Sequence, residues 1–343
     1  MLLATDFHVN TLTSSPYADS QSRDADATLS VVVPFLNEMA ILDVFVEELM
    51  PALESLEMPF EVICIDNGST DGTGDRLLMW RSRYPRLKLI KFSRYFGKEA
   101  ALTAGIDHAT GDAVVIMDPD LQDPPEMIRT FVEKWREGYD MVYATRRSSG
   151  IDTPLKAWLN TMFYRVFNFI CEQNIPFRTG DFRLIDAKIV HVLRRAREKS
   201  RFLRGLTTWA GFRSVSILFD QPKRRKGKSK SNYVFLWSYA LDAILSSTTR
   251  PLRIWTYIGF AVSLTALFAA GILVVRTLVF GRDVLGYASL MVAILFMGGF
   301  QLISTGVVAE YLGRVYREVQ NRPLYVVDEA YGLEAERVPP TFN

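Results

Sequence analysis

The residues most able to do chemistry lie in the segment 118–126, which reads Asp-Pro-Asp-Leu-Gln-Asp-Pro-Pro-Glu and directly follows an apolar stretch, residues 113–117. Because an extended backbone points alternate side chains the same way, we expect Asp118, Asp120 and Gln122 to share one face. Oxygen ligands of this kind suit Mg²⁺ or Mn²⁺, which fill their remaining positions with water and phosphate oxygens. The segment therefore predicts a metal site that holds a diphosphate, and the alternative is an acidic turn at the end of a strand.

The elements that must position this segment are strands and helices in alternation. Strand patterns at 29–33, 60–65, 87–92 and 113–117 alternate with helical patterns at 41–49, 74–84 and 98–109. This order predicts an α/β fold with a mostly parallel sheet covered on both faces, and ligands at the carboxyl ends of its strands. Three of the strands are followed by polar pairs, namely Asn37 with Glu38, Asp66 with Asn67, and Asp118 with Asp120. Their common position favours one binding site over three unrelated turns.

Several other chemistries are disfavoured. No Gly-x-Gly-x-x-Gly follows the first strand, and Gly227-Lys228-Ser229 lacks the upstream glycine and the strand of a P-loop, which argues against a dehydrogenase and a P-loop ATPase. The histidines and cysteines are scattered without metal-ligand or redox spacing, at His8, His108, His191, Cys64 and Cys171. The net charge of +2 decides nothing about partners, and we expect no nucleic-acid partner.

Two long apolar segments follow the α/β pattern. Residues 254–275 and 284–309 contain no charged side chain. At about 1.5 Å per residue, either segment as a helix would cross a hydrocarbon core of about 30 Å. We expect two transmembrane helices in a tight hairpin, and the alternative is a pair of buried core helices. Basic residues flank the hairpin on the side of the chain ends, at Arg250, Arg253, Arg314, Arg317 and Arg322, which predicts a cytoplasmic location for the α/β domain and both termini.

The sequence thus divides into five parts. Residues 1–28 are polar and acidic without a secretory signal, and we expect a disordered leader. An α/β domain is expected at 29–222, a basic loop with an interfacial amphipathic helix at 223–250, the two membrane helices at 251–312 and a cytoplasmic tail at 313–343. The aromatic-rich segments 158–170 and 233–245 suit helices at a membrane interface, or helices packed on the α/β domain.

Six motifs, in this order and followed by the paired apolar segments, carry a family resemblance. They are Val-Val-Val-Pro-Phe-Leu-Asn-Glu at 31–38, Asp-Asn-Gly-Ser-Thr-Asp-Gly-Thr at 66–73, Phe-Gly-Lys-Glu-Ala-Ala-Leu at 96–102, the 118–126 segment, Gly-Asp-Phe-Arg-Leu at 180–184 and Glu-Tyr-Leu-Gly-Arg at 310–314. With them the chain resembles the polyisoprenyl-phosphate glycosyltransferases of family 2, which have the Rossmann-like GT-A fold and include bactoprenol glucosyltransferases and dolichol-phosphate mannose synthases. The resemblance covers residues 29 to 327.

The resemblance implies roles for individual residues. Pro34, Glu38, Asp66 and Asn67 match positions that hold the nucleoside of the donor. Asp118, Asp120 and Gln122 match the positions that hold the metal, Mg²⁺ or Mn²⁺, and the donor diphosphate, and Asp181 matches the position usually assigned to the base. Asn67 stands where family members commonly carry an acidic residue, and Ser231 stands where they often carry an aromatic one.

The acceptor implied by the resemblance is a polyprenyl phosphate. Its second pKa lies near 6, so it is largely dianionic at neutral pH and acts as its own nucleophile. Asp181 then need not be a strong base, and we expect it to orient the acceptor or to stabilise positive charge at the anomeric carbon. Two dianions in one site need cations, and the candidates are Lys98 on the donor side and Arg146, Arg224 and Lys230 on the acceptor side. The hydroxyl of Ser229 is expected to bind the acceptor phosphate beside them. The basic loop 223–230 would equally be attracted to anionic headgroups.

The expected reaction is inverting transfer of a hexose, glucose from UDP-glucose in first place, to undecaprenyl phosphate at the cytoplasmic face of the inner membrane. GDP-mannose and a UDP-aminoarabinose derivative remain open as donors. A processive polysaccharide synthase is disfavoured because Gln-x-x-Arg-Trp is absent. The alternative from another class is a non-catalytic membrane scaffold. Small residues in the apolar segments, at Ala266, Ala270, Gly298, Gly299 and Gly306, would also permit close packing in a homo-oligomer.

Overall fold

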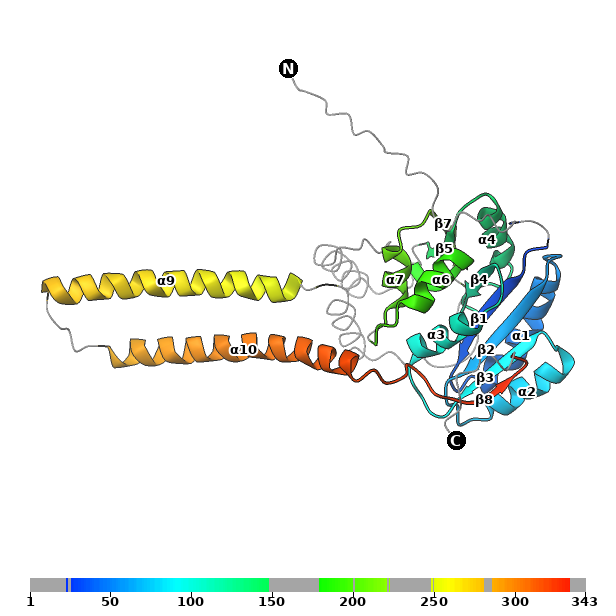
Figure 1. Ribbon diagram of the computed structural model, residues 1–343, viewed down its shortest axis with the longest axis horizontal. Coiled ribbons are helices and arrows are strands. Elements are labelled where there is room, and N and C mark those ends of the chain that lie inside the picture. The colour runs from blue at the N-terminus through cyan, green and yellow to red at the C-terminus, as the bar shows by residue number, and fades with distance from the viewer. Residues whose placement is uncertain are drawn as a thin grey trace, which may run out of the picture.

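The computed structural model describes residues 23, 26–147, 179–199, 201–220, 222, 248, 250–280 and 286–333. They form an α/β domain and a pair of long helices that extends away from it (Figure 1). The basic loop 223–230 and the aromatic-rich segments 158–170 and 233–245 lie outside the described residues, as do most of the leader and the last ten residues.

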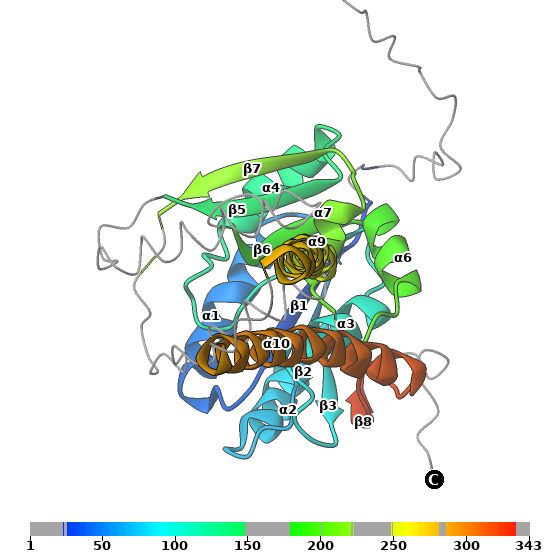
Figure 2. The ribbon, with the colours of Figure 1, turned by 90° about the vertical axis from the view of Figure 1, so that its left-hand side faces the viewer.

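The α/β domain is built on one eight-stranded sheet in the order β7-β5-β6-β4-β1-β2-β3-β8. Figure 2 looks at the domain from the side of the helical pair and shows the sheet running from β7 at the top to β8 at the bottom. The strands are β1 (Leu29–Phe35), β2 (Phe60–Asp66), β3 (Leu87–Phe92), β4 (Ala113–Ile116), β5 (Met141–Arg146), β6 (Thr179–Asp186), β7 (Ser214–Phe219) and β8 (Val327–Tyr331). The first four begin at the predicted residues and end within two residues of the predicted ends, because each is a short apolar run bounded by turn residues.

The sheet is mixed, but six of its eight strands run in the same direction, so the expected mostly parallel sheet is confirmed with two exceptions, β6 and β8. The four central strands, β3, β2, β1 and β4, run parallel. β6 is antiparallel to both β4 and β5, β7 is parallel to β5, and β8 is antiparallel to β3. β6 and β8 run against the other strands because the alternation of strand and helix that predicted parallel neighbours ends with β4. The later strands join the sheet through other connections.

Helices cover both faces of the sheet and enclose two apolar cores. They are α1 (Met39–Glu54), α2 (Thr73–Arg83), α3 (Lys98–His108), α4 (Met127–Arg136), α6 (Ala187–Arg195) and α7 (Leu203–Trp209). Residues of α1, α2 and α4 share one core with Val31 and Val33 of β1, whereas residues of α3, α6 and α7 share the other with Val32. This alternation along β1 follows the two-residue period of a strand, so both faces of the central sheet are apolar.

Helix α3 lies unusually close to the sheet, and this closeness matters because Lys98 is its first residue. A Cβ atom added to Gly105 would lie 2.2 Å from Cγ1 of Val32 and 3.0 Å from Cδ1 of Ile65. Only glycine therefore permits this approach. The packing fixes the axis of α3 and points its first turn at the carboxyl ends of the neighbouring strands.

The long helices are α9 (Arg250–Phe280) and α10 (Tyr287–Val319). They contact each other near the domain, where the rings of Trp255 and Phe300 lie 5.4 Å apart and the Tyr311 hydroxyl donates to the carbonyl of Thr248 at 2.9 Å. Many of their large apolar side chains are exposed. By a joint criterion of length and hydropathy, none of the helices in the described ranges qualifies as a membrane span, so the expected transmembrane pair is not confirmed.

The chain after α10 returns to the α/β domain. Tyr325 stacks on Phe92 with ring centroids 5.2 Å apart, β8 pairs with β3, and Lys91 binds Glu329 at 2.9 Å. The segment expected only as a tail thus supplies an edge strand. At the other end of the domain, the Arg23 guanidinium binds the Asp140 carboxylate at 2.6 Å, so ordered contacts begin before β1.

Candidate active site

The predicted polar residues meet at one edge of the sheet. β1, β2 and β4 are parallel neighbours, so Asn37, Asp66 and Asp118, which follow or end these strands, lie at the same edge. Pro34 is buried within β1 opposite Ile65, and Glu38 is half-buried at the start of α1. The structure thus brings these residues together at one edge, and their role in donor binding stays a prediction.

The loop after β2 is held by side chains of the predicted nucleoside site. Oδ1 of Asp66 accepts from the backbone N of Ser69 at 2.9 Å, and Oδ1 of Asn37 accepts from the backbone N of Thr70 at 2.8 Å. Asn67 is buried, and its Oδ1 accepts from the backbone N of Phe96 at 3.0 Å. The amide oxygen expected to meet the base therefore joins two loops in this structure.

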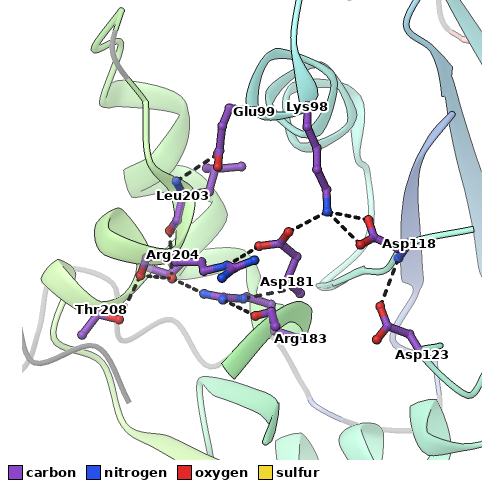
Figure 3. A network of polar contacts seen from close by, with 11 residues as sticks. Lys98, Glu99, Asp118, Asp123, Asp181, Arg183, Leu203, Arg204 and Thr208 are labelled. Atoms are coloured by element: carbon purple, nitrogen blue, oxygen red, sulfur yellow. Dashed lines mark hydrogen bonds and ion pairs between the residues drawn. The ribbon is translucent and has the colours of Figure 1, made fainter. Parts of the chain in front are cut away.

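Four charged side chains form the centre of the site (Figure 3). The Lys98 ammonium lies 2.7 Å from Oδ1 and 2.8 Å from Oδ2 of Asp118, and 2.6 Å from Oδ2 of Asp181. The Arg204 guanidinium binds the other oxygen of Asp181 at 2.6 Å. Lys98 thus connects the carboxylate expected on the donor side with the carboxylate expected at the reacting centre.

Arg204 is a site residue that sequence reasoning missed. It lies on the short helix α7, which Arg183 of β6 joins to the sheet by donating to Oγ1 of Thr207. Arg183 also donates to the carbonyl of Gly180 within β6, at 2.9 Å. Burial lowers the pKa of Arg183 to about 10, although the charge of Asp181 opposes this. The signal in the sequence was the pair Arg201 and Arg204 within an otherwise apolar helical stretch.

Asp181 is held as a carboxylate. Burial alone would raise its pKa, but the charges of Arg204 and Lys98, and the hydrogen bonds they donate, hold the pKa of Asp181 well below its usual range. A carboxylate stabilised in this way is a poor proton acceptor at neutral pH. The finding agrees with the expectation that Asp181 orients and stabilises charge instead of acting as a strong base.

The 118–126 segment forms a turn and not the extended strand assumed for it. The strand ends at Ile116, Leu121 has a φ of +57°, and Oδ1 of Asp120 accepts from the backbone N of Gln122 at 3.1 Å. The alternation of side chains predicted for Asp118, Asp120 and Gln122 is therefore wrong, because a strand geometry does not continue past the end of the sheet.

The turn nevertheless concentrates negative charge in a way that suits a cation. Asp123 is buried and accepts from the backbone N of Asp118 at 3.2 Å. Burial, and then the negative charges of Asp118 and Asp120, raise the pKa of Asp123 to about 7. Across the described part of the chain, no group of three or more His, Cys, Asp or Glu side chains is arranged to hold a metal ion. The metal ligands Asp118, Asp120 and Gln122 thus stay a prediction that fits the charge of the turn.

On the acceptor side the structure describes only Arg146, at the end of β5. Its Nη2 lies 3.6 Å from the position that a Cβ on Gly180 would take, one residue before Asp181. Its buried Nε has no hydrogen-bond partner within the described ranges. Arg224, Ser229 and Lys230 lie outside the described residues.

Glu99 gives the site a pH-dependent contribution to stability. Its carboxylate accepts from the backbone N of Leu203 at 3.1 Å, and burial followed by the charge of Asp181 raises its pKa from 4.5 to about 7. Between these two values the folded protein binds the proton more readily than the unfolded chain does, so stability falls as pH rises through that window. Glu99→Gln should therefore be more stable than the wild type at pH 8 by on the order of 1 kcal/mol, and no more stable at pH 4.

Chemical denaturation of both proteins at the two pH values measures this difference. Glu137→Gln is the matched control, because Glu137 pairs with Lys134 on the surface of α4. An equal difference between Glu99→Gln and wild type at both pH values would contradict the assignment.

Comparison with known proteins identifies the family. Residues 30–194 match the family described as glycosyl transferase family 2, and residues 250–315 match the GtrB C-terminal hairpin. An uncharacterized glycosyltransferase, sll0501, from Synechocystis sp. is 49% identical over 306 residues, which cover 89% of this chain and 96% of the relative. The SfII prophage-derived bactoprenol glucosyl transferase of Shigella flexneri is 41% identical over 304 residues, 88% of this chain and 98% of the relative.

The chain is therefore a glycosyltransferase enzyme, and it belongs to the family 2 glycosyltransferases that carry a GtrB C-terminal hairpin. The resemblance drawn from the motifs is confirmed, and the non-catalytic scaffold is not supported. Among solved structures, the mannosyltransferase PcManGT from Pyrobaculum calidifontis in complex with GDP-Man and Mn²⁺ is 17% identical with a TM-score of 0.39, covering 88% of this chain and 89% of that one. Similarity of this size assigns no ligand and no role to the present residues.

Proposed function

We propose that the protein transfers a hexose from a nucleotide sugar to a polyprenyl phosphate, with glucose from UDP-glucose and undecaprenyl phosphate as the first choices. The observation that carries this proposal is the ammonium of Lys98, which lies within 2.8 Å of both Asp118 and Asp181. A donor site and a reacting centre linked by one side chain suit a direct transfer between two phosphate-bearing substrates. Support also comes from the relatives whose names describe bactoprenol glucosyl transfer.

The proposed reaction is a single displacement that inverts the anomeric centre. A phosphate oxygen of the acceptor forms a bond to the anomeric carbon while the bond from that carbon to the donor diphosphate breaks, and the electron pair of that bond leaves with the nucleoside diphosphate. Because the acceptor is already ionised, no base has to remove a proton from it. In this proposal Asp181 faces the positive charge that develops on the sugar, and Arg204 keeps Asp181 ionised.

The donor diphosphate would be bound beside the 118–122 turn with a divalent cation, Mg²⁺ or Mn²⁺, held by Asp118, Asp120 and Gln122. Such a cation, when bound, neutralises the diphosphate leaving group. The charge of the turn supports this assignment, because Asp118 and Asp120 are close enough to Asp123 to raise its pKa. Arg146 supplies a cation on the acceptor side, together with the predicted Arg224 and Lys230, and Ser229 is predicted to donate to the same phosphate.

We further propose that the helical pair anchors the enzyme in the inner membrane, with the α/β domain and both chain ends in the cytoplasm. Support comes from the uncharged segments 254–275 and 284–309 and from exposed apolar side chains such as Phe260, Phe268 and Leu302, which are 69%, 73% and 75% exposed. A membrane position would bring the lipid phosphate to the domain. Close packing of a homo-oligomer through the small residues of these helices stays a prediction.

The experiment that tests the function supplies purified full-length protein with undecaprenyl phosphate, Mn²⁺ and, in separate reactions, radiolabelled UDP-glucose, GDP-mannose and a UDP-aminoarabinose derivative. We expect the label to enter the lipid fraction with UDP-glucose. Transfer from another donor would replace the sugar and keep the reaction class. Metal-dependent release of nucleotide without any lipid product would contradict the proposed acceptor.

A further inference from the structure

The position of the Lys98 ammonium also affects how a metal could bind to Asp118. Its ammonium covers both oxygens of Asp118, at 2.7 and 2.8 Å. Asp118 is also the first of the predicted metal ligands. The same carboxylate is therefore bound by the ammonium of Lys98 and predicted to bind the divalent ion.

The two cations compete for this carboxylate. A divalent ion on an oxygen of Asp118 would lie within a few ångströms of the ammonium, where two positive charges repel strongly. Because the ammonium already binds both oxygens of Asp118, one of the two cations has to move when the other binds.

Lys98 has a second carboxylate partner to which it can stay bound. Its ammonium is also anchored on Asp181 at 2.6 Å, and its side chain is 43% exposed. A lysine has three donors on a flexible stem, so it can keep one carboxylate while it turns its remaining donors toward a new acceptor. If Lys98 released the carboxylate of Asp118, it would stay beside Asp181 with donors available for a phosphate.

We propose that Lys98 is an exchangeable counter-ion: it occupies Asp118 in the metal-free enzyme and gives up this carboxylate when the divalent cation binds. The exchange rests on the metal-dependent transfer proposed above. Through it, binding of the metal together with the donor changes the position of the Lys98 ammonium at the reacting centre. Lys98 acts in this way as a positioning residue for Asp118 and Asp181, and as a donor to phosphate after the exchange.

The alternative is that Lys98 is only a structural ion pair between α3 and the ends of β4 and β6. These two roles predict opposite changes in metal affinity. Removal of a competing cation strengthens metal binding, whereas loss of a purely structural ion pair loosens Asp118 and weakens it.

The test measures Mn²⁺ affinity of full-length protein by electron paramagnetic resonance, without donor sugar and without lipid. Lys98→Met and Lys98→Gln both remove the charge, and we expect each to bind Mn²⁺ at least about tenfold more tightly than the wild type. Lys98→Arg keeps the charge and should bind Mn²⁺ about as the wild type does. Lys134→Met is the matched control, because Lys134 also forms an ion pair, with Glu137, but on the surface of α4.

Thermal unfolding of each variant establishes that the α/β domain is intact, and agreement between Lys98→Met and Lys98→Gln excludes an effect of side-chain shape. Unchanged or weaker Mn²⁺ affinity in both variants would overturn the exchange, as would the absence of Mn²⁺ binding in every protein. Because the titration contains neither sugar nor lipid, a wrong donor or acceptor leaves its result unaffected.

Discussion

Asp181→Asn is expected to lower the rate of sugar transfer by about 10²- to 10³-fold while donor affinity stays within a few-fold of the wild type. Asparagine has nearly the same shape as aspartate but no charge. The substitution removes the negative charge that would face the developing positive charge on the sugar. It also leaves Lys98 and Arg204, each 2.6 Å from the Asp181 carboxylate, without their shared partner. Donor affinity should change little because the predicted donor contacts come from other residues.

Single-turnover transfer from labelled donor to lipid measures the rate, and equilibrium titration with the nucleotide sugar measures the affinity. Higher pH should not restore the rate of the variant, because Asp181 is already ionised and is not proposed as a base. Asp43→Asn is the matched control, since Asp43 is likewise bound by an arginine, Arg76 at 2.8 Å, away from the site. Turnover near that of the wild type would show that Asp181 has no essential role.

Asp118→Asn should have the larger effect, a loss of transfer of about 10³-fold or more together with a loss of Mn²⁺ affinity. The amide keeps one oxygen but removes the charge that a divalent ion needs from its first ligand. In contrast to Asp181→Asn, the substitution should also weaken donor binding, because the donor diphosphate is proposed to bind together with the metal.

Mn²⁺ titration and donor titration, performed on the same preparation, distinguish the two aspartates. The expected pattern is loss of both affinities in Asp118→Asn and retention of both in Asp181→Asn. Wild-type Mn²⁺ affinity in Asp118→Asn would contradict the assignment of the metal to the 118–122 turn.

Much of the fold was predictable because it is encoded locally. The first four strands are apolar runs bounded by turn residues, and their alternation with helices predicts that Asn37, Asp66 and Asp118 lie at one edge of the sheet, where the structure has them. The two reversed strands, β6 and β8, were not predicted. β6 and β8 are paired with strands far away in sequence, and such pairing depends on connections that no local pattern specifies.

In the candidate site, too, local motifs predicted some residues, whereas contacts between residues distant in sequence were not predicted. Asp118 and Asp181 were predicted from motifs, but the ion pairs that join them through Lys98 span 20 and 83 residues of sequence. Arg204 belongs to none of the six motifs and reaches Asp181 only because α7 packs against β6. An acidic turn at 118–126 was kept as the alternative, but its left-handed φ at Leu121 is not expected from the residue type.

The most direct test of the central claim is transfer of labelled glucose from UDP-glucose to undecaprenyl phosphate by the wild type, Asp118→Asn and Asp181→Asn under identical conditions with Mn²⁺. The account predicts a labelled lipid whose hexose is joined through one phosphate in the wild type, and almost none with either variant. No labelled lipid from the wild type with any of the tested donors, or equal amounts from all three proteins, would contradict it.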